Sequence, residues 1–193
     1  KVADHQREDF SKSLLIIGKQ IKQIENLVNK FSDFARMPKP ILKDNNLVSL
    51  IKDNIKLINE LDEKIIIDFK SNKADIFFNS DNEQLSRVFF NLIKNSIESI
   101  QDKKIDNVDL IGKIDISLND SAEKIDFIII DNGLGFEILA DDIKNILNPY
   151  FTTKKKGTGL GLSIVNKIIN DHNGKINFVS LESGAKIEIV FIK

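Results

Sequence analysis

The sequence predicts an α+β fold, a two-layer α/β sandwich in which helices cover one face of a mixed sheet, preceded by one long helix. Three observations predict it. Apolar residues at heptad spacing mark the long helix. Alternating apolar residues further along mark strands. These strands and the helices between them mix without a strict βαβ repeat. We expect two domains, residues 1–40 and residues 41–193.

The long helix is predicted from Phe10 to Ala35, where apolar residues recur in alternating steps of four and three. The sequence MPKP, with Pro38 and Pro40, then ends it. Such a narrow stripe fits either a helix that faces its own core or a helix of a bundle or coiled coil that dimerises. We favour the second, a homodimer through Phe10–Ala35, because one helix cannot bury this stripe alone.

The second domain is predicted to contain helices and strands in mixed order. Helices are expected at Leu47–Asn59, Asn82–Ile100 (with Asp81 as N-cap), Ile138–Leu147 and Leu160–Asp171. Strands are expected at Ile65–Phe69, Ala74–Phe78, Lys113–Leu118, Lys124–Ile130, Gly174–Ser180 and Ala185–Ile192. A polar loop is expected at 148–156.

Composition excludes several classes of function. The chain has 193 residues and a net charge of -1, which gives no support for nucleic-acid binding. It has no cysteine, so disulfides, thiolate zinc sites and a cysteine nucleophile are excluded. Two histidines make a multi-histidine metal site improbable. No apolar run reaches the ~18 residues of a membrane span. The chain starts without Met, and we expect a part of a longer protein.

The first polar group lies in NLIKNSIES. Asn91, Asn95 and Glu98 share a face of an otherwise apolar helix, because they are four and three residues apart. Their oxygens suit Mg²⁺. The alternative is that the amides cap or bridge groups inside the fold.

The second group, DNGLGF, directly follows a predicted buried strand. Asp131 could accept a hydrogen bond from an exocyclic amine, and Gly133 and Gly135 allow close backbone approach. Alone, Asp-Asn-Gly is also an ordinary turn signal.

The third group is GTGLGLSI, which matches neither the Rossmann nor the Walker A glycine pattern. Gly157, Gly159 and Gly161 lead directly into a helix. Free backbone N–H groups at a helix start can hold phosphate oxygens.

Together, the Asn-rich helix, the strand followed by DNGLGF, then PYFTTK and GTGLGLSI resemble the ATP-binding domain of the GHKL superfamily (gyrase B, Hsp90, MutL and histidine kinases). The resemblance covers about residues 47–192 and implies the Bergerat fold, with ATP and Mg²⁺ as ligands. It implies that Asn95 holds Mg²⁺ with Asn91 nearby, and that Asp131 binds the adenine amino group. The remaining implied nucleotide-binding residues are Gly133, Gly135, Phe151, Thr152, Thr153, Lys154, Gly157, Thr158, Gly159, Leu160 and Gly161. Lys154 is our best candidate to meet the γ-phosphate from a mobile lid, whereas Lys155 and Lys156 are equally well explained as solvated charges.

The branch of the superfamily is indicated by Asn91. ATP-hydrolysing members carry a Glu base four residues before the Mg²⁺-binding Asn, and an amide cannot take a proton. Histidine kinases need no such base, because a neutral imidazole is itself the nucleophile. FSDFARMPKP, Phe31–Pro40, resembles the end of the second bundle helix of NtrY-type nitrogen-regulation sensor kinases.

The phosphoacceptor motif of that family is absent. His5 is followed by QREDF and is interpreted as a solvated loop residue, and His172, in NDHNG, as a structural residue. We therefore expect no catalytic histidine in this chain and no autophosphorylation in cis. The resemblance implies three partners: ATP or ADP, a phosphoacceptor bundle of its own or a partner chain, and a response regulator. It implies a cytoplasmic domain of a membrane-anchored parent. Two other functions stay open, a non-catalytic nucleotide-sensing module and a GHKL ATPase.

Overall fold

The computed structural model describes residues 10, 12–22, 24–25, 28, 32, 37–59, 65–136, 143–152 and 158–193. It divides into two compact units, Lys1–Pro38 and Lys39–Lys193. In the first unit, the described residues between 10 and 32 are helical, and their large apolar side chains are exposed. Among the described residues, no helix combines the length and apolar character needed to cross a membrane.

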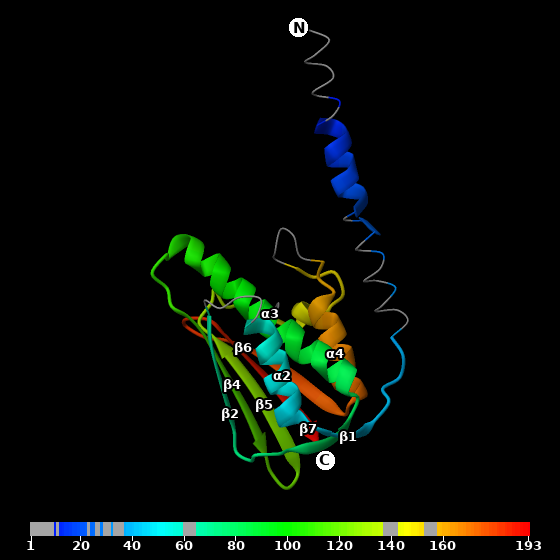
Figure 1. Ribbon diagram of the computed structural model, residues 1–193, viewed down its shortest axis with the longest axis vertical. Helices are drawn as coiled ribbons and strands as arrows, with labels where there is room; N and C mark the ends of the chain where they lie inside the picture. Colours follow the sequence, from blue (N-terminus) through cyan, green and yellow to red (C-terminus); the bar gives the residue numbers. More distant parts are fainter. Residues whose placement is uncertain are drawn as a thin grey trace. The chain divides into compact units, whose positions relative to one another are not determined.

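The second unit is a mixed sheet covered by helices on one face (Figure 1). The strands of the main sheet are β2 (Ile65–Ser71), β4 (Gly112–Asp120), β5 (Lys124–Asp131), β6 (Gly174–Ser180) and β7 (Ala185–Ile192). Their order is β2-β4-β5-β7-β6. Only β2 and β4 run parallel, and the other neighbours are antiparallel. The predicted fold class is confirmed.

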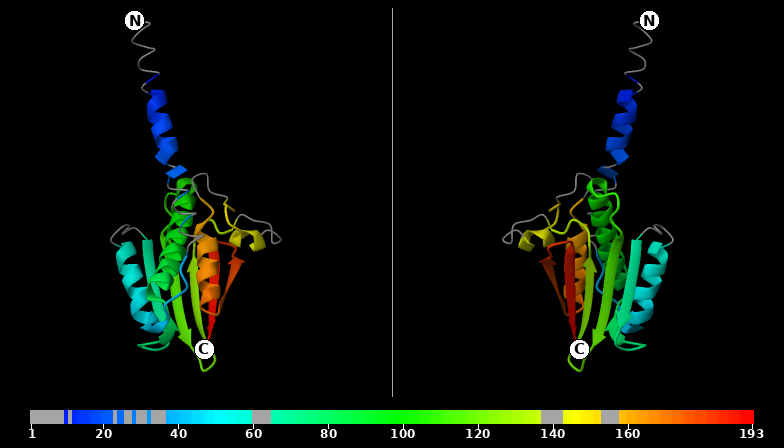
Figure 2. Two further views of the ribbon diagram at one scale, coloured as in Figure 1. Left: turned by 90° about the vertical axis from the view of Figure 1, so that its right-hand side faces the viewer. Right: turned by 90° about the vertical axis from the view of Figure 1, so that its left-hand side faces the viewer.

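Helices form the second layer, on one face of the sheet, as the side views in Figure 2 show. They are α2 (Leu47–Asn59), α3 (Asn82–Asp106) and α4 (Gly161–Asp171). The helix α3 lies between the other two and packs on β4 and β5. Phe89 of α3 meets Phe127 of β5 with ring centroids 4.8 Å apart. Burying one such aromatic side chain stabilises the fold by about 1.5–3 kcal/mol.

Helix α3 begins as predicted and ends later than predicted. The Asp81 carboxylate accepts a hydrogen bond from Gln84 N (3.0 Å), which is the expected N-cap. The helix continues past the predicted end at Ile100 to Asp106, where Asn107 N–H donates to Lys103 O. Lys103 and Lys104 in the last turn suit the negative end of the helix dipole.

A two-stranded ribbon corrects one predicted strand. Ala74–Phe78 was expected, but β3 is Phe77–Ser80, and it pairs with β1 (Lys43–Asn46), which the sequence did not predict. Side-chain amides supply bonds that apolar alternation does not reveal: Asn45 Nδ2 donates to Ser80 O at 2.6 Å.

The helix predicted at Ile138–Leu147 is described only in part. A 3₁₀ helix, η1, occupies Ile143–Leu147, and the predicted residues 138–142 lie outside the described part. Helix α4 begins at Gly161 instead of Leu160. The bounds of β6 and β7 match the prediction.

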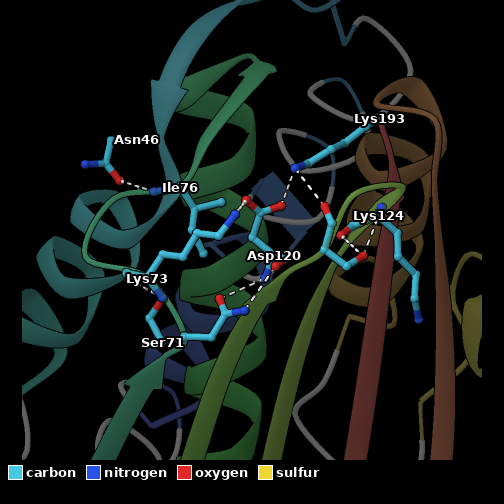
Figure 3. A network of polar contacts seen from close by, with 9 residues as sticks. Asn46, Ser71, Lys73, Ile76, Asp120, Lys124 and Lys193 are labelled. Atoms are coloured by element: carbon cyan, nitrogen blue, oxygen red, sulfur yellow. Dashed lines mark hydrogen bonds and ion pairs between the residues drawn. The ribbon is translucent and has the colours of Figure 1, made fainter.

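At the end of the sheet where β4 turns into β5, Asp120 binds two lysines (Figure 3). Lys73 Nζ lies 2.6 Å from Asp120 Oδ2, and Lys193 pairs with Oδ1. These two ammonium groups lower the pKa of Asp120. The two ion pairs join the segment after β2 and the last residue of the chain to the end of β4.

Candidate functional site

The opposite end of β5 carries the buried carboxylate of Asp131. Along β5, Ile125, Phe127 and Ile129 point into the core, and Asp131 takes the next core-facing position. It is only 4% exposed, and its Oδ1 accepts a hydrogen bond from Gly133 N at 3.0 Å. Burial raises the pKa of Asp131, and its polar neighbours only partly offset this. An ionisable group held in this way is a candidate ligand-binding group.

A second buried polar atom lies beside it. The Ser96 side chain is 2% exposed, and its Oγ has no hydrogen-bond partner among the described residues. It lies close enough to the Asp131 carboxyl to lower its pKa. A buried hydroxyl next to a buried carboxylate gives this position two polar groups that a bound ligand can contact. Ser96 is not among the site residues that the sequence predicts.

The DNGL turn lies directly against α3. Leu134 N donates to Ser99 Oγ at 3.0 Å. A Cβ on Gly133 would lie 2.8 Å from the Ser99 backbone carbon, so only glycine fits here. Gly135 has φ +79, and a Cβ there would lie 2.6 Å from Gly184 O. Both predicted glycines therefore serve close backbone approach, as the sequence indicated.

The segment around Tyr150 and Phe151 lies against the glycine-containing stretch before α4. Tyr150 N donates to Gly159 O at 3.1 Å, and a Cβ on Gly159 would lie 2.7 Å from Phe151 N. Tyr150 and Gly159 both have positive φ (70° and 66°). For a tyrosine this is a strained conformation of the kind that concentrates at functional sites.

The start of α4 lies next to Asn91. A Cβ built on Gly161 would lie 3.7 Å from Asn91 Oδ1. No side chain caps this helix end, and Leu160 before it is fully buried. Uncapped N–H groups at a helix start can bind an anion. Asn91 itself donates from Nδ2 to Arg87 O, which leaves its Oδ1 toward α4.

Of the remaining predicted site residues, the structure describes some, and others lie outside the described part of the chain. Asn95 is half-buried on α3, one turn from Asn91, and Thr158 is half-buried shortly before α4. Thr152 is exposed after Phe151. Thr153, Lys154 and Gly157 lie outside the described residues, as do Lys155, Lys156 and His5.

His172 has the structural role predicted for it. It is 3% exposed, and its Nε2 accepts a hydrogen bond from Asp81 N at 2.9 Å. Its Nδ1 then carries the proton and donates to Ile168 O at 2.8 Å. The neutral ring ties the end of α4 to the start of α3 and takes no part in the site.

Sequence reasoning missed several residues around Asp131. Ser96, Ser99 and Lys103 on α3 and Gly184 in the β6–β7 turn all contact or adjoin the DNG turn. Ser-Gly in a predicted hairpin turn was a usable signal for Gly184. No sequence pattern marks Lys103.

Comparisons with known proteins identify the family of the chain. The profile of the family "Histidine kinase-, DNA gyrase B-, and HSP90-like ATPase" matches residues 80–193, more than half of the chain. A Rickettsia felis protein named as an NtrY-like sensor histidine kinase is 34% identical over 187 residues, 96% of this chain and 30% of that protein. Nitrogen regulation protein NtrY of Azorhizobium caulinodans is 35% identical over 92% of this chain and 23% of its own length.

Solved structures give the same result. The catalytic domain of histidine kinase ThkA, in a nucleotide-free form, superposes with a TM-score of 0.67 at 32% identity, covering 79% of this chain and 95% of that one. Histidine kinase ThkA in complex with response regulator protein TrrA has a TM-score of 0.74 at 27% identity, covering 92% and 49%. The chain spans about a third or less of the curated relatives it matches. It belongs to the family of histidine kinase-, DNA gyrase B- and HSP90-like ATPases, with NtrY-like sensor histidine kinases among its homologues.

Proposed function

We propose that this chain contains the ATP-binding catalytic domain of a two-component sensor histidine kinase of the NtrY type. The domain would transfer the γ-phosphoryl group of ATP to a histidine on a bundle helix, from which it passes to an aspartate of a response regulator. The observation that carries the proposal is the buried Asp131 carboxylate, whose pKa burial raises, with the buried Ser96 hydroxyl beside it. Together they offer an acceptor and a second polar group to an adenine ring.

The nucleotide would lie along α3. Asp131 would accept a hydrogen bond from the exocyclic amino group of adenine, and Gly133 and Gly135 let the turn after Asp131 pack against Ser99 and Gly184. From Ser99 to Asn91 the helix spans about 12 Å. The phosphates would therefore reach the start of α4, near Gly159, Leu160 and Gly161. Phe151, Thr152, Thr153, Lys154, Gly157 and Thr158 belong to the same proposal as lid and phosphate contacts.

Mg²⁺ would be held by Asn95, with Asn91 beside it, together with the phosphates of ATP. Among the described residues, no cluster of three or more His, Cys, Asp or Glu is placed to bind a metal ion. The amide oxygens of Asn95 and Asn91 suit Mg²⁺, because this ion usually takes few protein ligands and binds with substrate phosphates. When bound, Mg²⁺ would neutralise part of the negative charge of the phosphates.

The transfer needs little covalent chemistry from this domain. The lone pair of a neutral imidazole nitrogen attacks the γ-phosphorus, the bond to the β-phosphate oxygen breaks, and ADP leaves. No general base is required, because the attacking nitrogen carries no proton. Asn91, an amide in place of a carboxylate base, favours this reaction over ATP hydrolysis.

The acceptor and partners follow from the same family. We propose that residues 1–40 form part of a dimerisation and phosphotransfer domain, residues 41–193 the catalytic domain, and Phe10–Ala35 a dimer contact. The ThkA complex with TrrA supports a response regulator as the partner. A cytoplasmic domain in a membrane-anchored parent fits relatives about three times longer than this chain.

The test is phosphotransfer in trans. The chain is mixed with ATP–Mg²⁺ and a histidine-bearing bundle of an NtrY-type kinase, and phosphohistidine is measured. We expect transfer by the wild type and its loss in Asn95→Ala. Asn119→Ala, on an exposed strand position, is the matched control and should keep full activity.

The other outcomes favour the alternatives. ATP binding without transfer to any tested bundle would contradict the kinase and favour a nucleotide-sensing module. Steady hydrolysis well above background in the absence of a bundle would favour an ATPase.

A further inference from the structure

Lys103 continues a polar stripe on α3 that begins with the predicted phosphate-end residues. Asn91, Asn95, Ser99 and Lys103 are spaced four residues apart, so their side chains follow one slowly winding line on the helix. Asn91 lies next to the start of α4, and Ser99 binds the DNGL turn. The stripe thus runs along the whole proposed nucleotide site, and Lys103 is its last member.

The Lys103 ammonium is fully engaged. It donates to Asn132 O at 3.0 Å, to Gly133 O at 2.9 Å and to Ser183 Oγ at 2.7 Å. An ammonium has three N–H donors, and each has found one acceptor. The acceptors include the two carbonyls that directly follow Asp131. A charged donor makes these bonds stronger than neutral ones.

Lys103 joins two segments far apart in the sequence. One is the DNG turn after β5, and the other is the β6–β7 turn that contains Ser183 and Gly184. The two turns are already in backbone contact, because a Cβ on Gly184 (φ +102) would lie 2.9 Å from Asn132 Cα. With Lys103, the end of α3 fixes both turns at once.

The ammonium also acts on Asp131 without binding it. Burial raises the pKa of Asp131, whereas Gly133 N–H, the Ser96 hydroxyl, Ala185 N–H and the Lys103 charge lower it. These groups face the carboxyl from the turn after β5, from α3 and from β7. Lys103 supplies the cationic charge among them, and so favours the ionised carboxylate that an amino group would bind.

We propose that Lys103 is a positioning residue of the adenine subsite, which orients the Asp131–Gly133 turn so that the carboxylate selects a 6-aminopurine. The inference rests on the proposed nucleotide-binding function. It assigns Lys103 no contact with the nucleotide. It attributes base selectivity to the geometry that the ammonium imposes on the turn.

The experiment compares ADP with inosine diphosphate, which carries a carbonyl oxygen in place of the amino group. Both nucleotides are titrated calorimetrically, with Mg²⁺, into the full chain and its variants. We expect the wild type to prefer ADP by at least about tenfold. Lys103→Met should bring this ratio close to one, and Lys103→Arg should restore part of it.

The matched control is Lys104→Met. Lys104 is the neighbouring lysine in the last turn of α3 and is also half-buried, but its ammonium faces Gly112. The same loss of charge there should leave the ratio at its wild-type value. A general loss of stability lowers both affinities and does not change their ratio, so the ratio separates positioning from folding.

Ser183→Ala covers the case in which Lys103→Met does not fold. Ser183 is exposed, and its loss frees the ammonium from one of three partners, so the ratio should fall by a few-fold. A wild-type ratio in Lys103→Met overturns the inference, as does a wild-type ratio in Ser183→Ala if the former is unfolded. A folded wild type that binds neither nucleotide overturns the proposed function itself.

Discussion

Asp120 and Asp131 lie at opposite ends of the β4–β5 hairpin, and their carboxylates have opposite surroundings. The Asp120 side chain is 9% exposed and pairs with Lys73 and Lys193, which lower its pKa (Figure 3). Asp131 is 4% exposed, and within the described part of the chain no ion pair reaches it. Its pKa is raised by burial.

These contrasting surroundings distinguish a structural carboxylate from a ligand-binding one. A buried charge is costly unless it is paired, so the Asp120 pairs offset a cost that Asp131 leaves largely uncompensated. A protein keeps such a group where a ligand completes its interactions. The comparison therefore predicts that substitutions at the two ends separate stability from binding.

Among the substitutions at the two ends of the hairpin, Asp131→Asn should weaken nucleotide binding most. The amide presents an N–H group where the adenine amino group needs an acceptor, so ADP affinity should fall by roughly 10- to 100-fold. The free energy of unfolding at pH 7 should not fall, because the substitution removes an ionised group that burial disfavours. Calorimetric titration and urea unfolding followed by circular dichroism measure the two quantities. A loss of stability equal to the loss of affinity would contradict the comparison.

Gly184→Ala should have the second largest effect, on both the unfolding free energy and the ADP affinity at the Asp131 end of the hairpin. Gly184 has φ +102, and a Cβ there would collide with the Asp131 carbonyl group. We expect a loss of about 1–3 kcal/mol in unfolding free energy, together with weaker ADP binding. Gly18→Ala, where a Cβ meets no atom within 4 Å, is the control and should not destabilise the chain. Wild-type unfolding of Gly184→Ala would show that the turn tolerates rearrangement.

How much of this could be predicted from the sequence differs between the elements. The bounds of β6 and β7 were predicted correctly, because Gly174 and the 181–184 turn delimit two alternating runs. Asp131 was singled out because DNGLGF directly follows the predicted buried strand IDFIII, where a carboxylate at the strand end can accept a hydrogen bond. In both cases the signal is local: a period, a turn residue, or a break in a pattern.

What the sequence did not reveal depends on contacts between distant segments. The strand β1, KDNN, has no apolar alternation, and amide bonds such as Asn45 Nδ2 to Ser80 O join it to β3. Lys103 is one of 28 Lys and Arg residues, and only the folded chain shows that its ammonium reaches Asn132 and Gly133. Side-chain hydrogen bonds to a distant backbone leave no periodic trace in a sequence.

A smaller effect is expected for Asp120→Asn at the other end. Lys73 is 53% exposed, so solvent screens its pair, and we expect a loss of about 1 kcal/mol in unfolding free energy. ADP affinity should keep its wild-type value. Asp115→Asn, a carboxylate 47% exposed and paired with Lys113, is the control and should change stability by less than about 0.5 kcal/mol. Weaker ADP binding in Asp120→Asn would contradict the division of roles between the two ends.

The smallest effect is the pH dependence of the difference in unfolding free energy between each Asp→Asn variant and the wild type. The folded pKa of Asp120 lies below the usual 3.8, so its contribution is present above that value and is lost as the pH falls through the folded pKa. The deficit of Asp120→Asn relative to the wild type should therefore shrink as the pH is lowered from 7 toward 3.

The folded pKa of Asp131 lies above 3.8, so ionisation costs stability as the pH rises through the range between the two values. The wild type should therefore lose stability relative to Asp131→Asn as the pH rises from 3 to 7. The two variants should diverge from the wild type in opposite directions over the same range, which urea unfolding at pH 7, 5, 4 and 3 can measure. Divergence in the same direction would mean that Asp131 is stabilised by partners in the fold, and it would then be a structural residue like Asp120.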